Sequence, residues 1–151
     1  MPLTEYQTVV NADLKTCFDL ARNIEFHSKS LKRHNIIPIE GRTTGLIKCG
    51  EIVTFESKHF GFVRHVTLKI TAYDAPNYFI VEMTSGFFKS FKHEYIFHEG
   101  EDGTIVINRF YFELPYGVLG KLVNVLVLKK YMRKLLSLRA KALKDRAEKN
   151  T

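Results

Sequence analysis

The spacing of hydrophobic residues changes along the chain, from three and four near both ends to two in the middle. Residues 3–10 alternate loosely between apolar and polar and predict a first strand. In residues 14–21 the apolar side chains recur at spacings of three and four, which predicts a short helix with Asn11 or Asp13 in position to cap it. A second short helix is predicted over residues 24–31.

From residue 51 to residue 114 the dominant period is two, as is typical of strands with one buried face. Before this region, residues 41–50 contain three glycines and predict turns around a short strand. The β-rich runs are separated by short turn segments and cover residues 51–60, 62–73, 78–85, 88–98 and 104–114. Connections this short join antiparallel neighbours, so the pattern predicts a meander with one apolar and one polar face.

Residues 118–151 predict one long helix. Its first part is almost wholly apolar, and its second part has an apolar stripe made of Leu128, Tyr131, Met132, Leu135 and Ala142. A helix that is apolar on every side must be covered on every side. The apolar face of the meander is the surface left to cover it, so we expect an α+β protein whose sheet curls around the last helix in a single domain, residues 1–151.

Charge is concentrated in this last segment. Residues 118–151 contain ten Lys and Arg against two acidic residues, a net of +8, whereas residues 1–117 contain thirteen against fourteen, a net of −1. The basic side chains opposite the stripe include Lys129, Lys130, Arg133, Lys134 and Lys141. They form either a solvated face, on which the helix dipole stabilises cations near the C-terminus, or a surface that contacts anionic membranes. Nucleic-acid binding is not favoured, because no recognition motif is present and the aromatic rings are expected inside.

Composition and motifs exclude several classes. With 45% hydrophobic residues the chain can build a core, while Lys121, Lys129 and Lys130 interrupt the best candidate for a transmembrane span. The first residues lack the pattern of a signal peptide, so we expect a cytoplasmic protein. No metal site and no cofactor are expected, since the histidines and two cysteines lack ligand spacing and no phosphate-binding or dinucleotide-binding glycine motif occurs.

Three polar residues fall on the apolar face of the predicted sheet when its pleats are counted: Arg64, His93 and Asn108. Arg64 either reaches water at the mouth of an interior space or meets an anionic partner such as a ligand carboxylate. His93 either forms a hydrogen bond with a neighbour such as Asn108 or Tyr95, or contacts a ligand or acts in acid–base chemistry.

The order of elements and two sequence segments resemble a known superfamily. The segments are FKHEYIF at residues 91–97 and YFELPYGVLG at residues 111–120, which runs into the last helix. They resemble bacterial single-domain members of the START, Bet v 1 and polyketide cyclase superfamily, also called SRPBCC proteins. The resemblance covers nearly the whole chain and implies a helix-grip fold, in which a curved antiparallel sheet of about six or seven strands wraps around a long C-terminal helix.

The resemblance also implies a cavity for an apolar molecule such as a lipid, a polyketide or an aromatic compound. The residues expected to contact this ligand are Arg64, His93, Asn108, Phe79, Met83, Phe91, Phe110, Phe112 and Tyr116. A binding protein, monomeric or loosely dimeric, is the leading interpretation. The alternatives are a cyclase or dehydratase in which His93 is the general base and Arg64 steadies an anion, and a module that uses the basic helix at anionic membranes.

Overall fold

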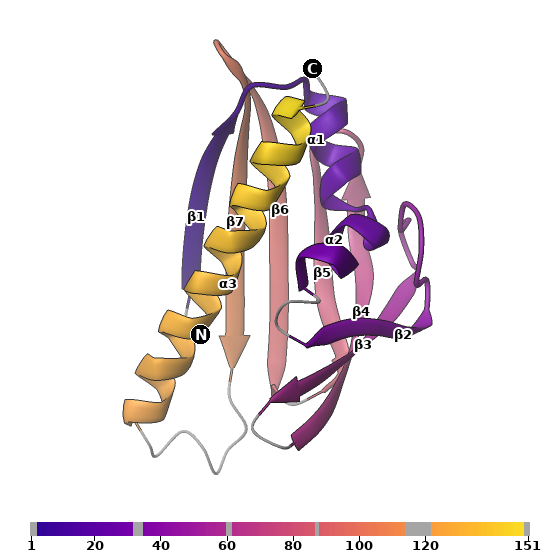
Figure 1. Ribbon diagram of the computed structural model, residues 1–151, viewed down its shortest axis with the longest axis vertical. Coiled ribbons are helices and arrows are strands. Elements are labelled where there is room, and N and C mark those ends of the chain that lie inside the picture. The colour runs from indigo at the N-terminus through magenta and orange to yellow at the C-terminus, as the bar shows by residue number, and fades with distance from the viewer. Residues whose placement is uncertain (1–2, 32–34, 60–61, 87, 114–121, 150–151) are drawn as a thin grey trace.

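The computed structural model of the protein describes residues 3–31, 35–59, 62–86, 88–113 and 122–149, with side chains in the last helix from Lys129 onward. These residues form one seven-stranded sheet and three helices (Figure 1). In chain order they are β1 (Leu3–Val10), α1 (Leu14–Ala21), α2 (Ile24–Leu31), β2 (Ile36–Gly41), β3 (Ile52–His59), β4 (Phe62–Asp74), β5 (Tyr78–Ser85), β6 (Ser90–Gly100), β7 (Gly103–Glu113) and α3 (Leu122–Lys149).

The sheet is antiparallel throughout, with the strand order β1-β7-β6-β5-β4-β3-β2. The predicted meander is therefore confirmed, and β1 extends it by pairing with β7. One strand differs from the prediction, which placed a short strand within residues 41–50. In the structure this strand, β2, ends at Gly41, and Leu46 forms an isolated bridge with Asn23. The α+β helix-grip fold with two short helices after the first strand is confirmed.

Strands β6 and β7 show why a period of two determines the inner face. Buried and partly buried residues alternate along both strands. In their shared register His93 pairs with Phe110, and Tyr95 pairs with Asn108. Because residues that face each other across an antiparallel pair point to the same side, these four side chains belong to one surface.

All three helices lie on this inner face of the sheet (Figure 1). The side chain of Asp13 caps α1 by accepting a hydrogen bond from the backbone N–H of Thr16 at 3.0 Å. Phe18 of α1 is 1% exposed and lies edge-on to Phe79 and Phe97, with ring centroids 5.4 and 5.3 Å away. Edge-to-face aromatic packing fixes α1 against the centre of the sheet.

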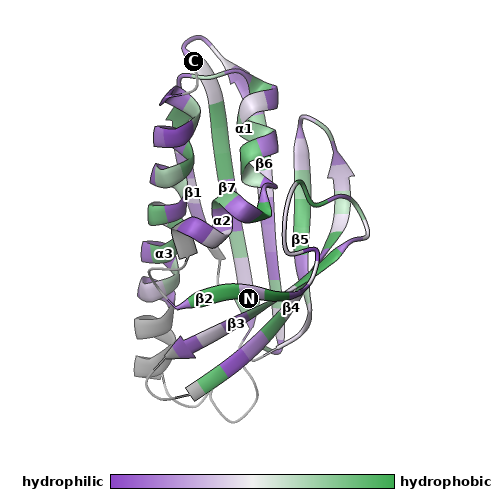
Figure 2. Ribbon diagram, turned by 45° about the vertical axis from the view of Figure 1, so that its right-hand side comes forward, coloured by the Kyte–Doolittle hydropathy of each residue, from purple (hydrophilic) through white to green (hydrophobic). Residues whose placement is uncertain are grey.

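The buried stripe of α3 differs from the predicted one. It consists of Leu136, Ala140, Leu143 and Ala147, all at most 5% exposed. Tyr131 of the predicted stripe is 38% exposed, and Leu135 and Ala142 are partly buried. Alanines allow close approach of a helix but contribute little to a hydrophobic pattern, so the larger side chains dominated the sequence signal. Figure 2 shows the resulting alternation of hydrophobic and hydrophilic residues along α3.

The C-terminal part of α3 is tied to the end of β1. Lys144 Nζ donates hydrogen bonds to the Val9 carbonyl oxygen and to the Glu148 carboxylate, both at 2.7 Å. That carboxylate also accepts the backbone N–H of Asn11 at 2.9 Å. Two of these three hydrogen bonds join residues more than 130 positions apart in the sequence, and they hold this end of the helix in place.

Replacing Phe18 tests the aromatic packing beneath α1. We expect Phe18→Ala to lower the free energy of unfolding by about 3–5 kcal/mol, because a buried ring is lost and a cavity is left. The matched control is Val63→Ala, whose side chain is 58% exposed and whose loss should cost less than about 1 kcal/mol. Urea unfolding followed by circular dichroism measures both, and equal effects of the two changes would contradict this account of the core.

Candidate ligand-binding site

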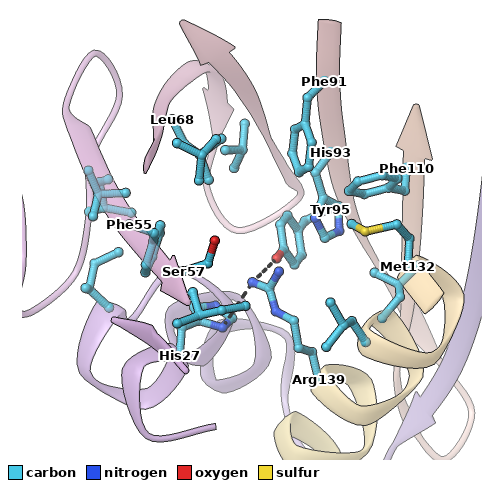
Figure 3. A pocket seen from close by; sticks show the side chains of 18 of the residues that line it. His27, Phe55, Ser57, Leu68, Phe91, His93, Tyr95, Phe110, Met132 and Arg139 are labelled. Atoms are coloured by element: carbon cyan, nitrogen blue, oxygen red, sulfur yellow. Dashed lines mark hydrogen bonds between the residues drawn. The ribbon is translucent and has the colours of Figure 1, made fainter. Parts of the chain in front are cut away.

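A cavity of about 560 Å³ lies between the inner face of the sheet and α3 (Figure 3). Its described walls come from strands β2 to β7 and from all three helices, and most of the lining side chains are aliphatic or aromatic. Phe55, Leu68 and Phe91 are examples. Small-molecule sites commonly have volumes of about 300–1,000 Å³, so the cavity is large enough for a ligand of ordinary size.

The predicted contact residues divide into two groups. Phe79, Phe91, Phe110, Arg64 and His93 line the cavity. Arg64 is largely exposed, which places it at the mouth rather than in the interior. The inner face of the sheet therefore brings these five residues together around one space.

The remaining predicted contacts lie elsewhere. Met83 is partly buried but does not line the cavity, and Phe112 is fully buried in packing against Phe88 and Phe110. Asn108 is held in a hydrogen bond with His93. Tyr116, expected near a portal, lies outside the described residues.

His93 is 2% exposed, and one of its two ring nitrogens has a hydrogen-bond partner among the described residues. Its Nε2 lies 3.0 Å from Asn108 Oδ1, which can only accept, so Nε2 carries the proton and donates. The ring stacks on Tyr95 with centroids 3.9 Å apart. Burial and the nearby charge of Arg139 hold the pKa of His93 well below its ordinary value. At neutral pH the imidazole is uncharged and a weak general base.

Arg139 of α3 is the functional side chain that the sequence analysis missed. It lines the cavity, and its guanidinium points into it (Figure 3). Nη2 donates to the hydroxyl of Tyr95 at 2.7 Å and to Nδ1 of His27 at 3.1 Å. One signal was available: Arg139 stands three residues after Leu136 and four after Leu135, so a cation interrupts an apolar row of the helix.

His27 of α2 completes this cluster. It is 7% exposed, and its Nε2 donates to the carbonyl oxygen of Ala21, so Nδ1 is left to accept from Arg139. Burial and the charge of Arg139 lower its pKa to about 3. Burial raises the pKa of Tyr95, although Arg139 opposes this effect. Arg139 is therefore surrounded by uncharged partners at neutral pH.

The described lining residues include Arg22, Arg64 and Arg139 but no Asp or Glu. Arg22 is paired with Asp19, with 2.9 Å between Nη2 and Oδ1. In the part of the chain that the structure describes, no group of three or more His, Cys, Asp or Glu side chains could hold a metal ion. No helix formed by the described residues is long and apolar enough to cross a membrane.

A curved antiparallel sheet that grips a long C-terminal helix, with an apolar cavity between them, defines the class of helix-grip, Bet v 1-like proteins. The family model "Polyketide cyclase / dehydrase and lipid transport" matches residues 2–148. The chain belongs to this family, within the SRPBCC superfamily. No curated protein sequence matches it.

Solved structures share this fold at low sequence identity. The protein TTHA0849 of Thermus thermophilus is 18% identical, with a TM-score of 0.77 and 99% of each chain covered. Major latex-like protein 151 of Panax ginseng is 17% identical, with a TM-score of 0.66 and 97% of each chain covered. The di-domain ARO/CYC StfQ from the steffimycin biosynthetic pathway is 12% identical with a TM-score of 0.67, and the match covers 98% of this chain and 51% of StfQ.

The buried His27 predicts a pH dependence of stability. Its pKa of about 3 in the folded state lies below the ordinary 6.5, so the unfolded state binds the proton first as the pH falls. Stability present above pH 6.5 is therefore lost as the pH approaches 3, by roughly 2 kcal/mol at pH 5. The lowered pKa of His93 acts in the same direction.

We expect His27→Gln, which keeps a donor and an acceptor but does not titrate, to reduce the slope of the plot of unfolding free energy against pH between about 7 and 4.5, leaving the part that His93 contributes. The control is His98→Gln, because His98 is exposed at the end of β6 and should leave the plot unchanged. Urea unfolding at a series of pH values gives both plots. A wild-type slope in the His27 variant would show that His27 is not the titrating group.

Proposed function

We propose that the protein binds a hydrophobic small molecule in the cavity between the sheet and α3. The observation that carries this proposal is the cavity of about 560 Å³, whose described lining is mostly apolar. Removal of apolar ligand surface from water, about 25 cal/mol per Å², supplies most of the affinity before the cost of association. A few polar side chains orient the ligand, as in other sites of this kind.

Phe79, Phe91 and Phe110 are the predicted contacts best placed for the apolar part of this ligand, since all three line the cavity. Arg64 acts at the mouth, where it is exposed to solvent. The family description, which includes lipid transport, supports a binding role.

The geometry favours binding over a cyclase or dehydratase that uses His93. The imidazole is 2% exposed and hydrogen-bonded to Asn108. A base with a strongly lowered pKa accepts a proton poorly at neutral pH, and an imidazole whose Nε2–H is already bonded to Asn108 is not free to donate that proton to a substrate. A ligand can occupy the cavity without requiring either property.

Filling the cavity tests the proposal. Leu68→Trp places a large ring in the space that Leu68 lines, whereas Lys69→Trp places it on the exposed side of the same strand. We expect the first variant to bind the neutral fluorophore N-phenyl-1-naphthylamine at least about tenfold more weakly and the second to bind it like the wild type. Circular dichroism checks that both variants are folded.

Native mass spectrometry of the protein purified from its own host is the complementary measurement, and we expect it to show a bound apolar molecule. If no molecule is found and the fluorophore does not bind the wild type, the protein is not a hydrophobic carrier.

A second role is favoured by the exposed face of α3. We propose that this face contacts anionic membranes while the cavity exchanges its ligand. The exposed basic residues are Lys129, Lys130, Arg133, Lys134 and Lys141. Four of them flank Tyr131 and Met132, which line the cavity, so the basic face adjoins one wall of the site. Each basic residue close to an anionic bilayer contributes about 1 kcal/mol of attraction.

Vesicle sedimentation tests this contact. We expect the wild type to bind vesicles containing phosphatidylserine and to dissociate as salt is raised, because salt screens the attraction. The combined variant Lys129→Gln, Lys130→Gln, Arg133→Gln should bind at least about tenfold more weakly. The control variant Lys69→Gln, Lys92→Gln, which removes two positive charges from the sheet, should have little effect on vesicle binding. Equal binding to vesicles of phosphatidylcholine alone would contradict an electrostatic contact.

A further inference from the structure

We propose that the ligand of the cavity is an amphipathic carboxylic acid, whose carboxylate pairs with the guanidinium of Arg139 while its apolar part lies against the sheet. This inference rests on the proposed binding function and specifies the class of ligand. The evidence begins with Arg139, a cation on α3 whose side chain points into the cavity.

Arg139 has more hydrogen-bond donors than partners. A guanidinium has five N–H groups, and Nη2 uses its two on Tyr95 and His27. The Nε atom is buried without a hydrogen-bond partner among the described residues. Nε is enclosed by protein atoms, so the donors left for a ligand in the cavity are those of Nη1, which makes no hydrogen bond with a described residue. A polar group left without a partner away from water carries a cost that an incoming acceptor removes.

The charge of Arg139 is also left without a counterion by the described residues. No Asp or Glu carboxylate from this part of the chain lies within salt-bridge distance of its guanidinium, and the described cavity lining has none. Its two neighbours are uncharged at neutral pH, because the pKa of His27 is lowered to about 3 and that of Tyr95 is raised. An anion delivered by the ligand would turn a costly isolated charge into a pair.

The charge balance favours a carboxylate over a phosphate monoester. One interior guanidinium neutralises a single negative charge, whereas a dianion would leave a second charge in a mostly apolar space. Arg64 does not change this balance, since it is exposed at the mouth, where solvent screens its charge. Ser57 of β3 also lines the cavity and adds an uncharged hydroxyl to its lining (Figure 3).

A matched pair of ligands tests the proposal on the wild-type protein. Dodecanoate and 1-dodecanol have the same chain length and differ in the head group, and both compete with N-phenyl-1-naphthylamine. We expect dodecanoate to bind at least about tenfold more tightly than dodecanol at neutral pH. Dodecyl phosphate, measured above its second pKa, should bind more weakly than dodecanoate.

Variants then assign the preference to one side chain. Arg139→Met keeps an apolar chain of similar width and should abolish the preference for the acid, measured as the ratio of the dodecanoate and dodecanol affinities in the same variant. Arg139→Lys keeps the charge and should retain part of the preference. Arg133→Met removes an exposed cation from the same helix and should leave the preference intact.

The outcomes separate this inference from the function on which it rests. If the fluorophore and dodecanol bind but the wild type does not prefer dodecanoate, the carboxylate assignment is wrong and the binding function stands. The same conclusion follows if dodecyl phosphate binds more tightly, or if Arg139→Met keeps the wild-type preference. If the fluorophore and both ligands fail to bind the wild type, the binding function and the assignment both fall.

Discussion

The structure depends on one geometric constraint, the covering of a wide sheet by few helices. Seven strands spaced about 4.8 Å apart form a surface about 30 Å wide, whereas a helix with its side chains is about 10 Å across. Three helices side by side could match this width, but α1 and α2 have only eight residues each, about 12 Å, whereas the longest strand, β4, has 13 residues, about 44 Å. They therefore cannot cover the surface if it is flat. The sheet therefore curls toward α3, and the space that remains is the cavity of about 560 Å³.

The sequence predicted the parts of the fold where a single period dominates. The alternation along β7 and the middle of β6 predicted their paired inner faces, and the spacing of Leu14, Cys17, Phe18 and Ala21 predicted α1. Strand β2 was missed because it is an exposed edge strand with a proline in its centre. Exposure weakens the alternation of apolar and polar residues, and proline argues against a strand. Elements with one buried face can be predicted from the sequence, whereas edge strands of the sheet are harder to predict.

The candidate site could be predicted only in part. The alternation of side chains along a strand shows which face of the sheet a residue is on, but not whether it lies beside the cavity or in the packed core. Phe110 and Phe112 share a face, yet one lines the cavity and the other is sealed in packing. His93 and Arg139 are both polar groups in the interior, and their partners distinguish them: Asn108 satisfies the imidazole, while the guanidinium keeps a buried donor unpaired. This distinction requires coordinates, since the partners of Arg139 come from α2 and β6, far away in sequence.

The attachment of α3 to β1 through Lys144 and Glu148 has a mechanical consequence. A rod fixed near one end acts as a lever, so its displacement grows with distance from the fixed point. Arg139, held by Tyr95 and His27, is a further fixed point and the nearest one to the cavity wall. Met132 lies seven residues before it, about 10.5 Å along the helix axis, and a tilt of about 5° would carry Met132 through about 0.9 Å. Such a tilt would widen the cavity for a broader ligand while the hydrogen bonds between the strands of the sheet stay intact.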